Sequence, residues 1–357
     1  MSRLKSILKV GGVFCLAGLI GLPIASAVYQ ASAQASDQAA YSPPGALFEV
    51  QGTQMHLLCM GDGEPTLVFE SGLLSDIQSW DVVQPAISQT TRACSYDRSG
   101  LGYSEPVDHP QQAAEVAQRL HSLLSAAGIE GDMVLVGASI GGLQVRQFAH
   151  QFPERVSGMV LVDSSHEQQV QRFGDTEAEG PSGILKVASL LAPIGMLRLS
   201  GFVEMKFEES EISGQELEQA IAMQSQTHIP AAMTREVEAM KADMDANQPP
   251  PSLGDIPLIV LTQGLPLEEE EDFDPLDLEK IEEDKVERPI WSQLQLELSQ
   301  LSSQGTQVFA MKSDHHITDL EPELVISSIE SVLETVRDSD RVQDDAVLDH
   351  DSPDAQE

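Results

Sequence analysis

The pentapeptide Gly137-Ala138-Ser139-Ile140-Gly141 constrains the fold of this chain more than any other feature. An apolar run, Met133 to Val136, stands directly before it, and a helix-like segment, Leu143 to Gln151, follows it. A serine at a sharp turn between a strand and a helix has strained backbone angles and close neighbours, so it needs glycines on both sides. The pattern is that of a nucleophile elbow, which holds a serine hydroxyl clear of the backbone.

The N-terminal segment has the order of a secretory leader. Three basic residues precede an apolar stretch from Val10 to Val28, and Ala31-Ser32-Ala33 follow. Residues 1–33 are therefore predicted to be a signal peptide, with Ala25-Ser26-Ala27 as a second cleavage point. Because the apolar stretch is nearly long enough to span a bilayer, an uncleaved N-terminal anchor is the alternative. In both cases we expect the remainder to be exported, either periplasmic or secreted.

The charge of the chain limits its partners. Without residues 1–33, 57 acidic side chains face 17 basic ones. This balance argues against nucleic acid and against anionic membrane surfaces as partners, and it leaves the oligomeric state open. The remaining ~320 residues fit one domain with an insertion better than two independent domains.

Short apolar strands alternate with helical segments from residue 46 onward. This alternation predicts a mostly parallel α/β sheet covered by helices on both faces, with its active site at the carboxyl ends of the strands. We assign 46–163 and 256–337 to this core. Between them, in 164–255, three helical stretches without intervening strands predict an inserted helical cap. They are Ile184 to Met196, Glu216 to Gln226 and Met233 to Asp245.

Two acidic segments are expected to lie outside the packed core. Residues 267–288 are predicted to be an acidic loop, with a weakly ordered helix as the alternative, since 268–287 hold twelve acidic and two basic residues. The acidic tail, 338–357, is predicted to be disordered.

Several motifs, in order, resemble those of the α/β-hydrolase superfamily, in its branch of serine esterases and cofactor-free haloperoxidases. They are Val68-Phe69-Glu70-Ser71-Gly72-Leu73, Tyr96-Asp97-Arg98-Ser99-Gly100-Leu101-Gly102-Tyr103-Ser104, the elbow, Phe152-Pro153-Glu154-Arg155-Val156 and Ser313-Asp314-His315-His316. The resemblance implies an eight-stranded sheet. In that fold the second and fourth strands are neighbours, which would bring Cys59 next to Cys94 as a disulfide.

A serine nucleophile requires a base, and the base requires a group that orients it. The resemblance assigns the base to His315, although Asp314 stands where relatives usually have glycine, so His316 is the alternative. The acid that most relatives carry after the seventh strand is missing. Asp163, at the end of the sixth predicted strand, is the candidate acid, and Glu268 and Asp272 are the alternatives.

Two backbone amides are expected to form an oxyanion hole. Ile140 has the position of one donor in the elbow, and the resemblance of the loop Ser71-Gly72-Leu73 implies Leu73 as the other. Methionines in the predicted cap would favour a substrate with an apolar group if some of them face the site. No phosphate loop, Cys-x-x-Cys pair or His-Glu-x-x-His zinc motif is present, so no cofactor or metal is implied.

Together these features predict a serine hydrolase that cleaves carboxylic esters of small molecules through a covalent acyl-enzyme. Chemistry on an amide, lactone or peroxide with the same triad is an alternative. A catalytically idle receptor with the same fold is another. Haloalkane dehalogenases and epoxide hydrolases of this superfamily use an aspartate nucleophile, and the serine at position 139 disfavours them.

Overall fold

The computed structural model describes residues 2–174, 182–205, 213–264 and 278–350. The chain divides into two compact units. The first contains Met1–Pro44 and Pro181–Arg235, and the second contains Gly45–Gly180 and Glu236–Glu357. Each unit is described separately below.

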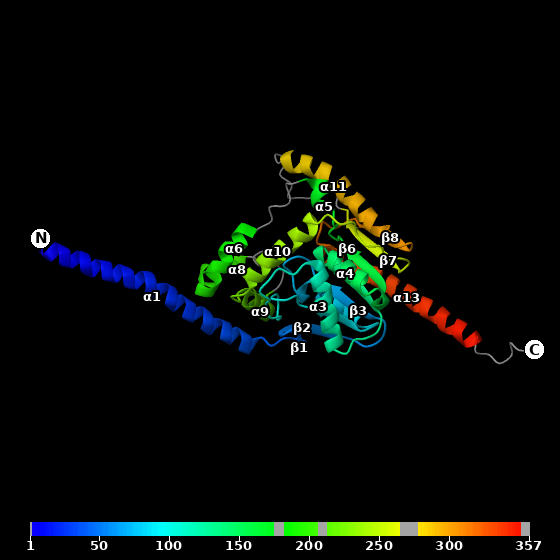
Figure 1. The fold of residues 1–357 in the computed structure, drawn as a ribbon, viewed down its shortest axis with the longest axis horizontal. Helices are drawn as coiled ribbons and strands as arrows, with labels where there is room; N and C mark the ends of the chain where they lie inside the picture. Colours follow the sequence, from blue (N-terminus) through cyan, green and yellow to red (C-terminus); the bar gives the residue numbers. More distant parts are fainter. Residues whose placement is uncertain (1, 175–181, 206–212, 265–277, 351–357) are drawn as a thin grey trace, which may run out of the picture. The chain divides into compact units, whose positions relative to one another are not determined.

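The second unit is built on one eight-stranded sheet in the order β1-β2-β4-β3-β5-β6-β7-β8 (Figure 1). β1 pairs antiparallel with β2 and β2 antiparallel with β4, while all other pairs are parallel. The predicted fold class is therefore confirmed. The strands are β1 (Ala46–Val50), β2 (Thr53–Met60), β3 (Thr66–Glu70), β4 (Ala93–Tyr96), β5 (Met133–Ala138), β6 (Val156–Val162), β7 (Leu258–Gln263) and β8 (Gly305–Ala310).

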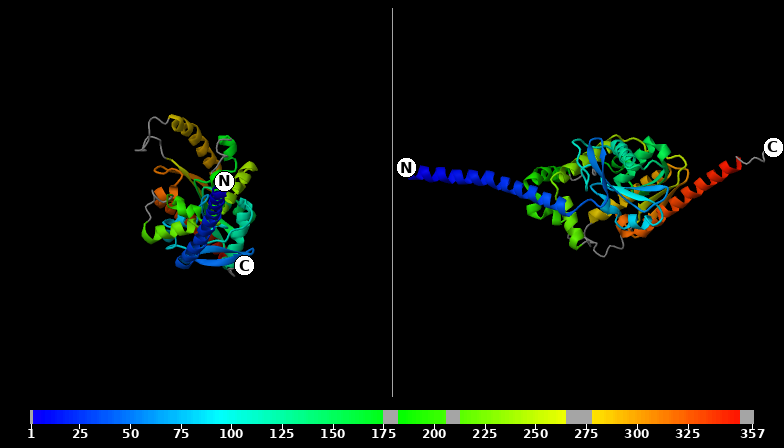
Figure 2. Two further views of the ribbon diagram at one scale, coloured as in Figure 1. Left: turned by 90° about the vertical axis from the view of Figure 1, so that its left-hand side faces the viewer. Right: turned by 90° about the horizontal axis from the view of Figure 1, so that it is seen from below.

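Alternate side chains of the central strands enter two separate cores, one on each face of the sheet. Val68, for example, belongs to one core, whereas its neighbours Leu67 and Phe69 belong to the other. Helices α3 (Ala113–Ala126), α4 (Ile140–Gln151) and α11 (Leu278–Ser299) contribute to the first core. Helices α2 (Val83–Ile87) and α13 (Pro322–His350) contribute to the second. Helices thus cover both faces, as Figure 2 shows from two further directions.

A disulfide joins the antiparallel edge to the sheet. Cys59 on β2 and Cys94 on β4 are direct partners in the register, with Cα atoms 4.0 Å apart, and their sulfurs are bonded. The pairing that the resemblance implied is present in the structure.

The first unit is helical. Helix α1 (Ser2–Ala40) contains the predicted leader, and the Nε2 of Gln30 donates a hydrogen bond of 2.8 Å to the carbonyl of Ser225. Among the described residues, no helix is both long and apolar enough to cross a membrane. The other elements are α6 (Ser182–Leu191), η3 (Ala192–Ile194), α7 (Met196–Ser200), α8 (Phe202–Met205), α9 (Gly214–Gln224) and the first turns of α10 (Ile229–Asp245).

The expected helix from Ile184 to Met196 is wrong in extent. Helix α6 ends at Leu191, because Pro193 cannot continue it and Gly195 adopts a left-handed φ of 73°. The cap limits also differ from the expected 164–255. Residues 164–180 and 236–255 belong to the second unit, while the N-terminal segment shares the first unit with 181–235.

Both acidic segments contain helix in their described parts, which was one alternative for the first segment and was not expected for the tail. Residues 278–288 of the expected loop 267–288 form the start of α11, where Glu and Lys are good helix formers and the following turns are anchored by buried Leu294 and Leu298. Residues 265–277 lie outside the described part. In the acidic tail, 338–350 continue α13, with an ion pair between Asp338 and Arg341, and 351–357 are not described.

The disulfide gives a first prediction about stability. We expect the double variant Cys59→Ser/Cys94→Ser to lose about 3–4 kcal/mol of the free energy of unfolding, because the closed loop of 35 residues no longer restricts the unfolded chain. Urea unfolding of the oxidised wild type and of the variant measures this loss. Reducing agent should lower the stability of the wild type toward that of the variant and leave the variant unchanged. Equal midpoints for oxidised wild type and variant would contradict the prediction.

Candidate active site

Ser139 lies at the turn between the carboxyl end of β5 and the start of α4. Its backbone φ of 53° is in the left-handed region, and its N–H donates to the carbonyl of Val162 at 3.0 Å. The flanking glycines are required by space. A Cβ at Gly137 would lie 2.7 Å from backbone atoms of Gly142, and one at Gly141 would lie 2.5 Å from the carbonyl oxygen of Glu70. The elbow is therefore formed as the pentapeptide predicts.

His315 connects the serine to a carboxylate. It lies in the loop between β8 and the short helix α12 (Ile317–Leu320), and its side chain is 44% exposed. Its Nε2 is 3.0 Å from the Oγ of Ser139, and its Nδ1 is 2.6 Å from Oδ2 of Asp163. The neighbouring His316 instead pairs its Nδ1 with Asp314 at 3.0 Å. The structure thus brings His315, and not His316, to the serine.

Asp163 follows the last residue of β6 and is fully buried. Its φ of 42° turns the chain away from the strand direction. Besides His315, the carboxylate accepts hydrogen bonds on Oδ1 from the backbone N–H of Gln263 at 3.0 Å and from the indole N–H of Trp291 at 2.7 Å. These donors fix the orientation of the carboxylate toward His315. The alternative acids, Glu268 and Asp272, lie outside the described residues.

The electrostatic environment favours the protonated form of His315. Burial lowers the pKa of the imidazole, but the hydrogen bond and the negative charge of Asp163, together with the charge of Asp314, outweigh burial and raise the pKa above its ordinary value. The imidazole is thus a stronger base than an isolated histidine.

The loop after β3 lies against the nucleophile. A Cβ at Gly72 would be 3.5 Å from the Cβ of Ser139. Leu73, the expected oxyanion donor, is the next residue in the chain. Ile140, the other expected donor, is the first residue of α4 and is buried. The side chain of Leu73 packs on the cluster that contains Ile140.

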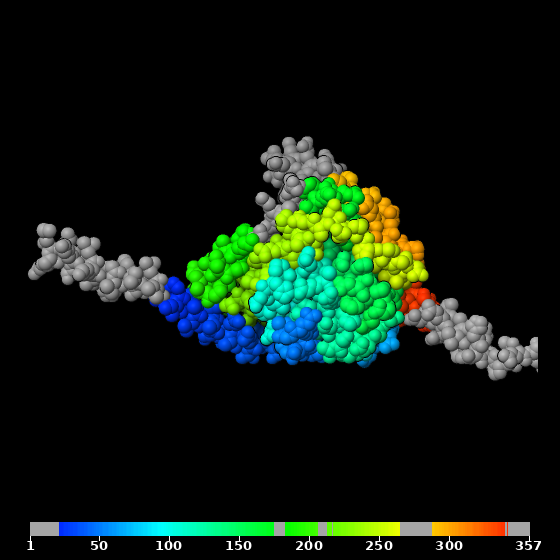
Figure 3. Space-filling model, in the orientation of Figure 1, coloured from blue at the N-terminus to red at the C-terminus, as the bar shows by residue number. Residues whose placement is uncertain are grey.

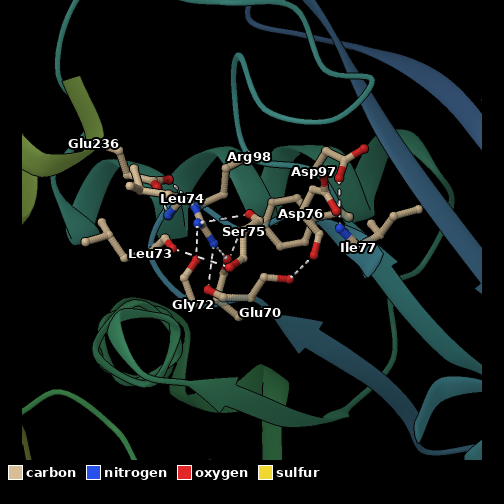
Figure 4. Close-up of polar contacts among 12 residues, drawn as sticks. Glu70, Gly72, Leu73, Leu74, Ser75, Asp76, Ile77, Asp97, Arg98 and Glu236 are labelled. Carbon is tan, nitrogen blue, oxygen red and sulfur yellow. Dashed lines mark hydrogen bonds and ion pairs between the residues drawn. The ribbon is translucent and has the colours of Figure 1, made fainter. Parts of the chain in front are cut away.

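One guanidinium holds this loop in place (Figure 4). Arg98 donates to the carbonyl of Ser71 at 2.7 Å and to that of Gly72 at 2.6 Å. It also forms ion pairs with Glu70 at 2.8 Å and with Glu236 at 2.6 Å. From helix α10, the second oxygen of Glu236 accepts from the N–H of Leu74 at 2.6 Å. The loop is therefore fixed from both its carbonyl and its amide groups.

The charges in this network are buried. Glu70 is 1% exposed, and burial raises the pKa of its carboxyl although Arg98 and the hydroxyl of Tyr96, which donates to it, act in the opposite direction. Burial lowers the pKa of the Arg98 guanidinium, but the carboxylates of Glu236 and Glu70 outweigh burial and raise this pKa above its ordinary value. Arg98 thus remains a cation and neutralises the carboxylates of Glu70 and Glu236.

Sequence reasoning missed two features of this region. The first is the pair of ion pairs that Arg98 forms with Glu70 and Glu236. The second is the contact of His56 with Asp97 in the core, where Nδ1 is 2.8 Å from Oδ2. The motif around Asp97 and Arg98 was the available signal, but it does not identify partners that are far away in the chain.

Apolar side chains adjoin the elbow. Ile140 and Leu143 of α4 form a cluster with Met244 of α10, and Leu73 and Met240 pack against it. Two of the methionines considered in the sequence therefore lie on the site side of the second unit. Within the described residues, no group of three or more His, Cys, Asp or Glu side chains could hold a metal ion.

Comparison with known proteins agrees with this architecture. Residues 65–178 match the family model of the alpha/beta hydrolase fold. An AB hydrolase superfamily protein of Gibberella zeae is 28% identical over 301 residues, which cover 77% of this chain and 88% of the relative. An uncharacterized protein of Schizosaccharomyces pombe is 29% identical over 46% of this chain, and the match spans 36% of that longer relative.

Solved structures show the same fold. A putative alpha/beta hydrolase from Nostoc has a TM-score of 0.60 at 18% identity, covering 81% of this chain and 97% of its own. A thermophilic esterase from Thermogutta terrifontis has a TM-score of 0.53 at 19% identity, covering 82% and 98%. An enol-lactonase from Burkholderia xenovorans has a TM-score of 0.55 at 16% identity, covering 81% and 100%. The chain thus has the α/β-hydrolase fold, and its residues 65–178 match the model of that family.

The buried network predicts a pH-dependent loss of stability in Arg98→Met. Without the guanidinium, the pKa of Glu70 rises further above its value in the unfolded chain, so the folded variant binds more protons. The free energy of unfolding of the variant should therefore fall as pH rises through the raised pKa of Glu70. We expect a loss of about 3–5 kcal/mol at pH 8 and a smaller one at pH 5, measured by urea unfolding.

The matched control is Arg155→Met. Arg155 is also buried, but its guanidinium donates to the backbone carbonyls of Ile129 and Gly131. The loss of unfolding free energy in Arg155→Met should be nearly the same at pH 5 and pH 8. An equal loss of unfolding free energy at pH 5 and pH 8 in Arg98→Met would show that Arg98 does not stabilise the protein by compensating the charge of Glu70.

Proposed function

We propose that this protein is an exported serine hydrolase that cleaves carboxylic esters through Ser139, His315 and Asp163. One observation carries the proposal. The serine Oγ, the two ring nitrogens of His315 and a buried carboxylate form a continuous chain with distances of 3.0 and 2.6 Å. This is the arrangement by which a base activates a serine and an acid orients the base.

In the proposed reaction, the Oγ of Ser139 attacks the acyl carbon while the Nε2 of His315 takes the hydroxyl proton. Asp163 holds the proton on Nδ1 and stabilises the imidazolium. When the tetrahedral intermediate collapses, the proton passes from His315 to the leaving alcohol and an acyl-enzyme remains. A water molecule, deprotonated by His315, then attacks the acyl carbon, and the acid is released as Ser139 recovers its proton.

The amides of Leu73 and Ile140 are the proposed oxyanion donors. In a trans peptide the C=O and N–H groups point in opposite directions. Since the carbonyl of Gly72 accepts from Arg98, the N–H of Leu73 must point away from that guanidinium. The contact of Gly72 with Ser139 supports the view that this N–H is available to the reacting carbonyl. Losing one such donor typically costs about 3–4 kcal/mol of transition-state stabilisation.

The proposed substrate is a small-molecule ester with an apolar group. Support comes from the cluster of Ile140, Leu143 and Met244 beside the elbow. The solved relatives include proteins described as an esterase, an N-acyl homoserine lactone degrading enzyme and an enol-lactonase. Because a lactone is a cyclic carboxylic ester, lactone opening is a variant of this chemistry.

Export is part of the proposal and rests on two features of this chain. The N-terminal residues have the order of a signal peptide or anchor, and a disulfide joins Cys59 to Cys94. Disulfides persist mainly in oxidising compartments.

We expect a fluorophosphonate probe to label the wild type rapidly and to fail with Ser139→Ala. Labelling of His315→Ala should be slower by roughly 10³-fold or more, because the serine then lacks its base. The variant His316→Ala, whose imidazole pairs with Asp314, is the matched control and should label like the wild type. An unlabelled wild type would reject the hydrolase and favour a receptor with the same fold.

The pH dependence of kcat/KM tests the role of Asp163. Because His315 must be neutral to act as the base and its pKa is raised, the acid limb should lie above the ordinary histidine value of about 6.5. In Asp163→Asn the limb should move to lower pH, and kcat should fall roughly 10³–10⁴-fold. Hydrolysis of p-nitrophenyl acetate between pH 4 and pH 10 measures both effects. Asp314→Asn should shift the limb less, and an unmoved limb in Asp163→Asn would exclude Asp163 as the acid.

A further inference from the structure

The first unit carries an open apolar groove. Helices α6, α7 and α8 enclose about 460 Å³, and apart from Ser200 only apolar residues line it, among them Ile184, Val187, Leu191, Leu197 and Phe202. Next to these residues in the chain, Leu190 is 76% exposed, and Ile184 and Val187 on the groove are 65% and 55% exposed. Soluble surfaces scatter such side chains singly, whereas gathered ones mark a site of interaction.

The charge around this surface differs from that of the rest of the molecule. Residues 21–36 and 182–203 hold two basic residues and no acidic one, whereas the rest of the chain holds 57 acidic and 18 basic residues. An anionic lipid surface would repel most of this protein but not these two segments, and a neutral one would repel neither. The strongly negative total charge therefore does not describe this surface.

The two segments meet within the first unit. Helix α1 contacts η3, and the side chain of Arg198 on α7 forms an ion pair of 2.7 Å with Asp37 of α1. Figure 3 shows the described part of α1 beside the segment 182–205. Along α1, Leu22, Ile24 and Val28 are also exposed. The unit thus combines an apolar groove with a helix whose residues 10–28 are apolar.

We propose that residues 182–203, together with α1, form a membrane-docking surface. The exposed side chains of α6 enter the interfacial region of a bilayer, and the groove takes up lipid hydrocarbon. Residues 182–203 contain no carboxylate that would oppose the headgroups, and the charge of Arg198 is balanced by Asp37 of α1. Binding of this kind depends on apolar area and on the absence of repulsion, and it needs no membrane-spanning helix.

Flotation of the full-length protein with phosphatidylcholine vesicles tests the proposal. The variant Ile184→Glu/Val187→Glu/Leu190→Glu should bind at least about tenfold more weakly than the wild type. The matched control, Leu47→Glu/Val82→Glu/Leu296→Glu, adds the same charge at exposed apolar positions of the second unit and should bind like the wild type. Equal binding of the wild type and the α6 variant, or equal weakening in both variants, would overturn the proposal.

A second measurement does not depend on inserted charges. In Leu190→Trp, brominated acyl chains should quench the added fluorescence, while in Val82→Trp they should not. Circular dichroism verifies that each variant is folded. Absence of quenching at position 190 would overturn the proposal. So would a concentration-dependent dimer in sedimentation equilibrium that the α6 charges abolish, because a second copy would then cover this surface.

Discussion

The buried carboxylate of Asp163 is the interaction on which the site depends. It joins the ends of two parallel strands to helix α11 and to the loop after β8, because its oxygens accept from Gln263, Trp291 and His315. A buried carboxylate without hydrogen bonds is costly in free energy, so moving any of these donors away from Asp163 would destabilise the fold. The same charge that orders these segments raises the pKa of His315 and thereby sets the basicity of the imidazole.

A second buried ionic group organises the opposite side of the nucleophile. Arg98 holds the carbonyls of the loop after β3, and Glu236 of α10 both neutralises Arg98 and accepts from the amide of Leu74. Glu236 lies in the segment that the sequence assigned to the cap, but it belongs to the second unit. The geometry of the proposed oxyanion loop thus depends on a helix that follows the long insertion.

The parts of the site that could be predicted are those set by local pattern. Ser139 and Asp163 end buried strands, and parallel strands bring their carboxyl ends to one edge, so their proximity follows from the order of the strands. Arg98 and Glu236 could not be paired, since 138 residues separate them and neither stands in a pattern that specifies its partner. The helix over 278–288 was one of two alternatives, because an acidic composition suggests a solvated loop although Glu and Lys also favour helices.

Helix α1 makes the processing of the N-terminus a question of timing. The peptide bonds after Ala27 and Ala33 lie inside an unbroken helix, and Gln30 between them is 2% exposed and bonded to Ser225. Proteases favour exposed and locally unfolded segments. A leader peptidase therefore competes with the folding of the first unit. A chain cut early after Ala33 would lose Gln30 and its contacts, whereas a chain that folds first would shield both bonds and keep its apolar N-terminus.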